Sequence, residues 1–154
     1  MKPIGHVSSP RDQPLDDDWD AITATITLDG TQFAPDALQG LEDFSHVEVV
    51  YIFDRVDPTT VQTRARRPRG NPDWPEVGIF AQRAKGRPNR IGVTVCRLLG
   101  VDGLTLTVQG LDAIDATPVL DLKPYMIEFA SRGQVHQPSW SHELMADYWH
   151  GPTT

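Results

Sequence analysis

The sequence predicts a small, mainly β protein, a single domain built as a β-barrel or sandwich with short peripheral helices. The chain has 154 residues, a length typical of one domain. Several short segments alternate apolar and polar residues with a period of two, which is the pattern of half-buried strands. Turn signals such as Asp29-Gly30 separate these segments. Together these observations predict an all-β architecture.

The first half of the chain contains three predicted strands and one predicted helix. "PIGHV" is a short first strand, and "HVEVVYIF" is a largely buried one. In "AITATITL", Ile22, Ala24, Ile26 and Leu28 lie on one face and threonines on the other. "APDALQGLEDF" between these strands is predicted as a short helix.

The second half begins with residues 54–77, a stretch rich in proline and arginine with no clear period, as in long functional or mobile loops. The predicted strands that follow are "EVGIFA", "IGVTVCRLLG", "GLTLTVQGLDAI" and "VLDLKPYMIEFA". The last segment, "PSWSHELMADYW", is predicted as a helix capped by Ser139 or Ser141. We therefore expect a barrel domain over residues 1–135 and a helical tail over residues 136–154.

Composition predicts a cytoplasmic protein without a membrane segment. The formal net charge is −7, no apolar run reaches the length of a membrane span, and the first residues lack the apolar core of a secretory signal. The single cysteine, Cys96, excludes an internal disulfide and fits a reducing compartment. Because Cys96 falls within a predicted strand, we expect a buried thiol rather than a nucleophile.

Common catalytic and metal-binding signatures are missing from the sequence. There is no GxGxxG, P-loop, GxSxG or HExxH motif, which removes the main support for dinucleotide, phosphate-loop, hydrolase and zincin chemistry. The five histidines lack the close spacing of metal ligands. We therefore predict no metal site.

Positive charge is concentrated in residues 64–90, which contain eight basic and two acidic side chains in an otherwise acidic chain. Such a run is often only a solvated face. Arginine predominates, however, and its planar guanidinium suits bidentate contacts with phosphate or carboxylate. The segment is therefore a candidate surface for an anionic partner.

Two further groups of polar residues lie at predicted strands. In "VLDLKPY", a period of two places Asp121, Lys123 and Tyr125 on one face of a strand. Asp54 and Arg55 follow directly after the buried strand "HVEVVYIF". Each pattern also occurs on ordinary solvent-exposed faces.

Three segments, "GLEDFSHVEVVYIF", "RARRPRGNPDWPEVGIFAQRAKGRPNRIG" and "LDAIDATPVLDLKPY", resemble the TsaA/VirR-like family over about residues 4–128. Members of that family include S-adenosylmethionine-dependent tRNA methyltransferases that act on threonylcarbamoyl-adenosine beside the anticodon. The resemblance implies a barrel-like domain that forms a homodimer and binds S-adenosyl-L-methionine near the dimer interface.

The resemblance also implies roles for particular residues. The implied catalytic residues, as proton acceptors or polarising groups, are Asp121 and Tyr125. The implied cofactor-binding residues are Asp54, Arg55, Arg83, Ala84, Thr94, Thr117, Pro118, Val119 and Leu120. The implied substrate-binding residues, for tRNA phosphates and the threonyl carboxylate, are Arg64, Arg66, Arg67, Arg87, Asn89, Arg90 and Lys123.

The chain departs from the family pattern at three places. Arg90 replaces the second proline of "RPNPIG", and Ala116 replaces a turn glycine, which is expected to change the backbone there. The N-terminal "PRDQPLDDDWD" is short and acidic, and its triplet Asp16, Asp17 and Asp18 is predicted as a solvated loop. The alternatives are a methyltransferase for a different acceptor and a non-catalytic barrel that binds S-adenosylmethionine or nucleic acid.

Overall fold

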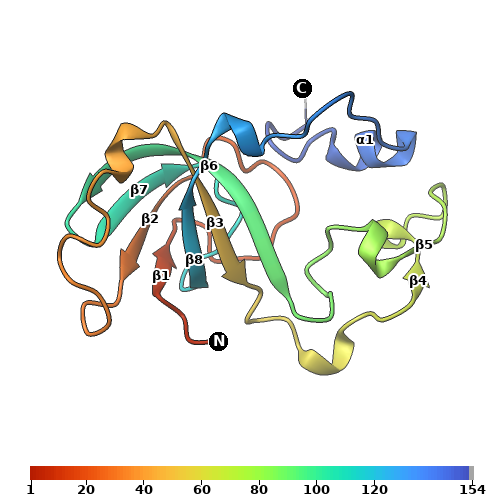
Figure 1. The fold of residues 1–154 in the computed structure, drawn as a ribbon. Helices are drawn as coiled ribbons and strands as arrows, with labels where there is room; N and C mark the ends of the chain where they lie inside the picture. The colour runs from red at the N-terminus through yellow and green to blue at the C-terminus, as the bar shows by residue number, and fades with distance from the viewer. Residues whose placement is uncertain (153–154) are drawn as a thin grey trace.

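The computed structural model describes residues 1–152, and its centre is a closed barrel of six antiparallel strands in the order β1-β2-β7-β6-β3-β8 (Figure 1). The barrel strands are β1 (Gly5–Ser8), β2 (Thr23–Leu28), β3 (His46–Ile52), β6 (Ile91–Asp102), β7 (Thr105–Gln109) and β8 (Pro118–Pro124). A separate pair, β4 (Ala65–Arg66) and β5 (Val77–Gly78), forms a small two-stranded sheet. The predicted mainly β, barrel-like fold is confirmed.

Alternation along the strands builds the core of the barrel. Every second residue of β2 and β3 is buried, and Ile26, Val49 and Leu106 are completely inaccessible to solvent. Because side chains of a strand point to opposite faces in turn, a period of two directs one apolar set into the barrel. β6 is long enough to pair with β3 along its first half and with β7 along its second half. This strand therefore joins the two halves of the wall.

Of two predicted elements, one is wrong and the other is shorter than predicted. The predicted helix over residues 34–44 is a series of turns that ends in a 3-10 turn over Leu41–Asp43, and Gly40 before it has φ of 87°, outside the α region. The predicted strand "EVGIFA" stops at Gly78, and Ile79–Ala81 forms a 3-10 turn that buries Ile79. Local apolar content predicted an element in both places but did not specify its geometry.

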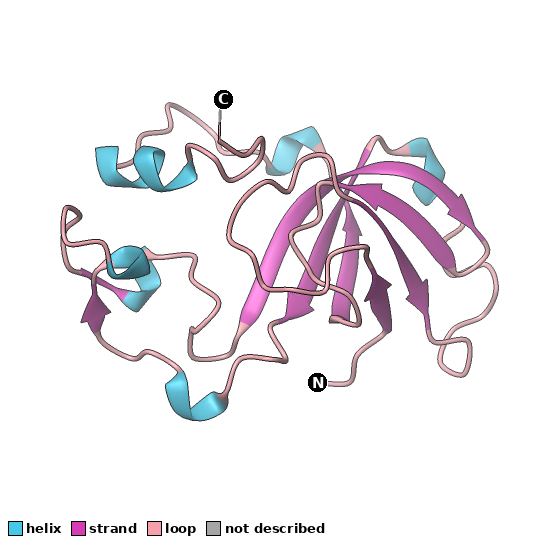
Figure 2. Cartoon of the chain, turned by 180° about the vertical axis from the view of Figure 1, so that it is seen from behind, coloured by secondary structure: helices cyan, strands magenta, loops and turns pink. Residues whose placement is uncertain are grey.

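Residues 54–90, which we name the arm, project from the barrel and carry β4, β5 and 3-10 turns at Pro58–Thr60, Pro68–Gly70 and Ile79–Ala81. Figure 1 shows the arm at the right of the barrel, and Figure 2 shows the same separation from behind. Helix α1 (Ser139–Met145) lies over the arm, where Trp74 Nε1 donates to Glu143 Oε2 at 2.7 Å. The predicted helix is confirmed, but Pro138 occupies its N-cap, so the predicted serine cap is wrong.

The chain after α1 joins the N-terminal loop to the barrel. The backbone N–H groups of residues 18–20 donate to the carbonyls of residues 147–149 at 3.1, 3.0 and 2.7 Å. Asp17 and Asp16 form ion pairs with Arg69 and Lys85 of the arm. The prediction of a solvated loop is confirmed, since residues 16–18 lie in a loop in which Asp16 and Asp18 are exposed, but the sequence did not predict that this loop contacts both the tail and the arm.

Candidate functional site

One end of the barrel gathers residues from distant parts of the sequence. β3 runs antiparallel to β6 and β8, so the end of β3 lies beside the starts of the other two strands. We name this end, with the loops of residues 9–12 and 110–117, the barrel mouth. Asp54 and Thr94 belong to it, because they lie at the end of β3 and near the start of β6.

Arg55 fastens two loops of the barrel mouth together. Its Nη1 donates to the Asp12 carbonyl at 2.9 Å, and its Nη2 donates to the Asp115 carbonyl at 3.2 Å. The Asp115 carboxylate accepts the backbone N–H of Ser9 at 3.0 Å. Arg55 thus has a structural role in the shape of the mouth, whatever it also binds.

Asp54 offers a free carboxylate at the same place. The residue is exposed, and its backbone N–H donates to the Ile52 carbonyl at 2.9 Å. Among residues 1–152, no hydrogen bond or ion pair of its carboxylate is recorded. Asp54 can therefore bind a cationic or hydroxyl group without losing an internal contact.

The segment from Thr117 to Leu120 is mostly committed to the barrel wall. Thr117 and Val119 are buried, and their carbonyls accept the N–H groups of Val7 and Ile4 at 2.9 and 2.8 Å. Pro118 is opposite His6 in the ladder between β1 and β8. Leu120 differs, because the register shifts between Val50 and Tyr51 and leaves it without an opposite residue on β3. A bulge of this kind frees backbone groups from the ladder, so Leu120 is the member best placed to contact a ligand edge.

A carboxylate that the sequence did not reveal, that of Asp112, lies in the mouth loop of residues 110–117. The hydroxyl of Tyr51 donates to Asp112 Oδ1 at 2.8 Å, and the hydroxyl of Thr94 donates to the same oxygen. The hydroxyl of Tyr148 from the tail donates to Asp112 Oδ2. We name these four residues the Asp112 cluster. The available signal was a single acid inside the apolar stretch "GLDAI".

Ionisation of nearby groups is suppressed in the Asp112 cluster. Burial, followed by the charge of Asp112, raises the pKa of the Tyr51 and Tyr148 hydroxyls well above the usual range. Burial and the same charge raise the pKa of Cys96 to about 12. Cys96 is almost fully buried, which confirms the expected buried thiol. The tyrosines therefore act here as hydrogen-bond donors rather than as bases.

Arg83 and Ala84 lie where the arm meets β6. Arg83 Nη2 donates to the Val93 carbonyl at 2.9 Å, while the residue as a whole is exposed. Ala84 is half-buried beside it. One edge of the Arg83 guanidinium is thus held by the barrel, and the remaining donors are available to an anion.

Asp121, Lys123 and Tyr125 share the outer face of the barrel wall, as predicted. Lys123 Nζ lies 2.9 Å from Asp121 Oδ2, and this contact raises the pKa of Lys123. The ring of Tyr125 lies edge-on to His46, with centroids 6.3 Å apart. Thr94 points into the barrel instead. Within one copy of the chain, the predicted catalytic residues and the buried predicted cofactor residues therefore occupy opposite sides of the wall.

Three arginines of the arm hold its own turns. Arg67 donates to the Trp74 carbonyl, Arg87 to the Gln82 carbonyl at 2.8 Å, and Arg90 to the Val56 carbonyl at 2.9 Å. Arg64 and Asn89 are exposed. Each carbonyl contact uses part of a five-donor guanidinium, so the other donors remain available.

Arg66 differs from the other arm arginines. Its Nε is buried, and no hydrogen-bond partner is recorded for it within the part of the chain that the structure describes. Burial of an unpaired donor costs free energy unless a ligand or solvent supplies an acceptor. Arg66 is therefore an arm residue that keeps a buried donor without an acceptor.

Both departures from the family motifs have unusual backbones. Ala116 has φ of 66°, the left-handed conformation of a turn glycine. Ala116 therefore adopts, under strain, a conformation that favours glycine. Arg90 has φ of 53°, which a proline ring cannot adopt, so this turn cannot match a proline-containing relative.

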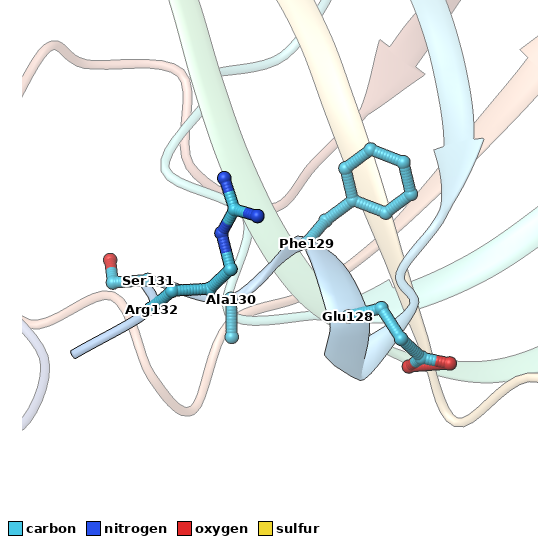
Figure 3. A pocket seen from close by; sticks show the side chains of 5 residues that line it. All are labelled: Glu128, Phe129, Ala130, Ser131 and Arg132. Carbon is cyan, nitrogen blue, oxygen red and sulfur yellow. The ribbon is translucent and has the colours of Figure 1, made fainter.

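Two cavities lie away from the barrel mouth. One, of about 440 Å³, is lined by residues 128–132 directly after β8, and Figure 3 shows that Phe129 and Arg132 point to the same side of this segment. The other, of about 300 Å³, lies between β6 and the tail and includes Arg97, Trp149 and His150. In residues 1–152, no cluster of three or more histidine, cysteine or acidic side chains is arranged to hold a metal ion. None of the helices described has the length and apolar character to span a membrane.

Comparisons with known proteins give a consistent result. The model of the tRNA-methyltransferase O N-terminal domain matches residues 6–131. The mouse tRNA (adenine(37)-N6)-methyltransferase is 36% identical over 111 residues, which are 72% of this chain and 25% of the mouse protein. A probable S-adenosyl-L-methionine-binding protein of Pyrococcus abyssi is 35% identical over 145 residues, 87% of this chain and 72% of that protein.

Solved structures agree with these matches. The crystal structure of TrmO from Pseudomonas aeruginosa superimposes with a TM-score of 0.70 at 30% sequence identity, covering 88% of this chain and 60% of the TrmO chain. The chain thus spans about a quarter of the mouse protein and three fifths of the bacterial one. With the family model covering most of its length, the chain belongs to the family of tRNA-methyltransferase O N-terminal domains.

Proposed function

We propose that the chain is an S-adenosylmethionine-dependent methyltransferase that acts on N6 of threonylcarbamoyl-adenosine next to the tRNA anticodon. The observation that supports the proposal is the barrel mouth, where Asp54 after β3 and Thr94 near the start of β6 lie at one end of the barrel, the same end as the register shift at Leu120 of β8. The names of the mouse and archaeal relatives support the reaction and the cofactor.

The residues of the mouth fit the chemistry of S-adenosylmethionine. The free carboxylate of Asp54 suits the amino group or the ribose hydroxyls, and the free edge of Arg83 suits the carboxylate. The bulged backbone at Leu120 suits the adenine edge. When bound, the cofactor supplies an electrophilic methyl group. The remaining contribution of the protein is alignment of the acceptor nitrogen.

The acceptor nitrogen carries a proton that must leave during methylation. We propose Asp121 or Tyr125 as the acceptor of this proton or as the group that polarises the ureido carbonyl. Lys123 Nζ lies 2.9 Å from Asp121 Oδ2, so the ammonium group stands beside the proposed acceptor.

We further propose that the active form is a homodimer. Asp121 and Tyr125 are on the outer face of the wall, so a second copy that sets its mouth against this face would bring the two groups together. Exposed apolar side chains are available near this face at Val93 and Val95 of β6 and at Ile127 and Phe129 after β8. A two-fold arrangement would use the same surface on both copies.

The arm is the proposed tRNA surface. The exposed Arg64 is the residue most available to phosphate, the half-buried Arg66 lies two positions away, and the free donors of Arg67, Arg87 and Arg90 add to them. Asn89 and Lys123 complete the proposed set of substrate contacts.

Two further proposals concern location and domain organisation. We place the protein in the cytoplasm, and we keep the boundary between barrel domain and tail at residues 135 and 136.

Calorimetry with S-adenosylmethionine tests the cofactor part of this proposal. We expect binding by the native chain and a loss of about tenfold or more for Arg83→Ala and for Asp54→Asn, because each change removes a charge-assisted contact. Asp36→Asn, which alters an exposed acid of the turn region before β3, is the matched control. No heat and no thermal shift at millimolar cofactor would refute cofactor binding.

Light scattering tests the dimer. The expected mass is twice the 17.1 kDa of the chain. Ile127→Glu and Phe129→Glu together should reduce the mass to that of one chain and abolish methyl transfer, because the proposed site needs both copies. A monomeric native protein with full activity would contradict this arrangement.

A further inference from the structure

The acidic segment of residues 16–18 occupies cations that the arm would otherwise present to RNA. Arg69 Nη2 lies 2.9 Å from Asp17 Oδ1, and its Nη1 donates to Asp17 Oδ2 at 3.3 Å, so both carboxylate oxygens are bound by one guanidinium. Lys85 Nζ lies 3.8 Å from Asp16 Oδ1 and donates to the Pro14 carbonyl at 3.4 Å. Two of the eight basic residues in 64–90 are thus neutralised within the chain.

The acidic segment is held in place from behind. Arg11 donates to the carbonyls of Asp17 and Asp18, both at 2.8 Å, and its guanidinium lies 4.2 Å from the centroid of the buried Trp19 ring. Asp18 has φ of 66°, a strained conformation for this residue. This support fixes the backbone so that Asp16 and Asp17 face the arm.

Both ion pairs are open to competition from solvent. The side chains of Arg69 and Asp17 are each 32% exposed, and those of Lys85 and Asp16 are about half exposed. Exposed ion pairs of this kind contribute little to stability, commonly less than about 1 kcal/mol each. A polyanion with closely spaced phosphates can therefore displace the carboxylates, but it must first break these pairs.

We propose that Asp16 and Asp17 are specificity-determining residues that withhold Arg69 and Lys85 from RNA phosphates. This inference rests on the proposed RNA substrate. RNA that is held only by backbone charge then binds weakly, because it must displace the two carboxylates. RNA that also places a modified base at the barrel mouth gains contacts that do not depend on Asp16 and Asp17. Specificity arises here from a built-in repulsive element.

The test measures binding of a polyuridylate 20-mer and of an anticodon stem-loop by fluorescence anisotropy as a function of salt. We expect Asp16→Asn with Asp17→Asn to raise polyuridylate affinity about tenfold at low salt. The log–log salt slope should become steeper by about 1.4, since two newly contacted phosphates on a single strand contribute about 0.7 each. Affinity for the stem-loop should rise less than affinity for polyuridylate.

A matched control separates this effect from net charge. Asp36→Asn with Asp43→Asn makes the same change in charge at exposed positions before β3, on the other side of the barrel from the arm. It should alter affinity less than twofold. Arg69→Ala should change affinity little in the native chain but should remove much of the gain in the double-asparagine variant. Equal gains in both charge variants, no gain in either, or additive effects of Arg69→Ala would overturn the inference.

Methyl transfer is measured separately on the same proteins. A chain that shows the expected RNA-binding pattern but methylates no tRNA would refute the proposed reaction and leave this role of Asp16 and Asp17 intact. Methylation by the native chain without any change of RNA affinity in the double-asparagine variant would refute only the role of the acidic pair.

Discussion

The barrel and the arm are held together by different forces. The barrel wall is a continuous ladder closed around an apolar core in which Ile26, Val49 and Leu106 are completely buried. The arm contains one two-residue strand pair and is fixed by arginines that donate to its carbonyls, such as Arg87 to Gln82. Hydrophobic burial is strong and non-directional, whereas each exposed hydrogen bond contributes little. The molecule therefore combines a stable scaffold with a polar region that remains open to an anionic partner.

Matched truncations in the barrel and the arm should give the largest difference in the free energy of unfolding. Leu106→Ala in β7 should lower the free energy of unfolding by about 3 kcal/mol, because it leaves a cavity in a closed core. Arg87→Ala in the arm should lower it by about 1 kcal/mol or less. Urea denaturation of the two variants gives the comparison. Equal losses would mean that the arm is part of the same cooperative core.

The second largest expected loss of stability comes from breaking the contact between the tail and the barrel. Tyr148→Phe removes the hydroxyl that donates to Asp112, and it should cost about 2 kcal/mol because the acceptor is charged and partly buried. Tyr125→Phe is the matched control, since no hydrogen bond of that hydroxyl is recorded among residues 1–152. Similar stabilities of both variants would show that the Asp112 cluster does not anchor the tail.

The smallest effect concerns the strained turn at Ala116. Ala116→Gly should raise the free energy of unfolding by about 1 kcal/mol, because glycine adopts φ of 66° without the Cβ clash. Ala37→Gly, at an exposed site outside the set of positive φ angles, should instead leave stability unchanged or slightly lower. A loss of stability in Ala116→Gly would mean that this turn carries no strain.

The scaffold was more predictable from sequence than the site. Alternation in "TATITL" predicted β2, and the apolar run "HVEVVYI" predicted β3, because burial of a strand leaves a local pattern. The Asp112 cluster has no such pattern, since Tyr51 and Asp112 are 61 residues apart. The bulge at Leu120 depends in the same way on the register between β3 and β8.

In the arm, too, the sequence did not reveal which side chains pair with one another. Its charge predicted an anion-binding surface, but the pairing of Arg69 with Asp17 joins residues 52 positions apart. Arg90 likewise donates to a carbonyl 34 residues away. Composition revealed the amount of positive charge, whereas only the fold shows how much of it is already used.

The most direct test of the account is methylation of a defined tRNA. Threonylcarbamoylated tRNA is incubated with the native chain and S-adenosylmethionine, digested to nucleosides and analysed by mass spectrometry. We expect the gain of one methyl group on the hypermodified adenosine, none on the unmodified adenosine, and a large loss of transfer in Asp54→Asn. An unchanged nucleoside profile at a cofactor concentration that saturates the protein in calorimetry would contradict it.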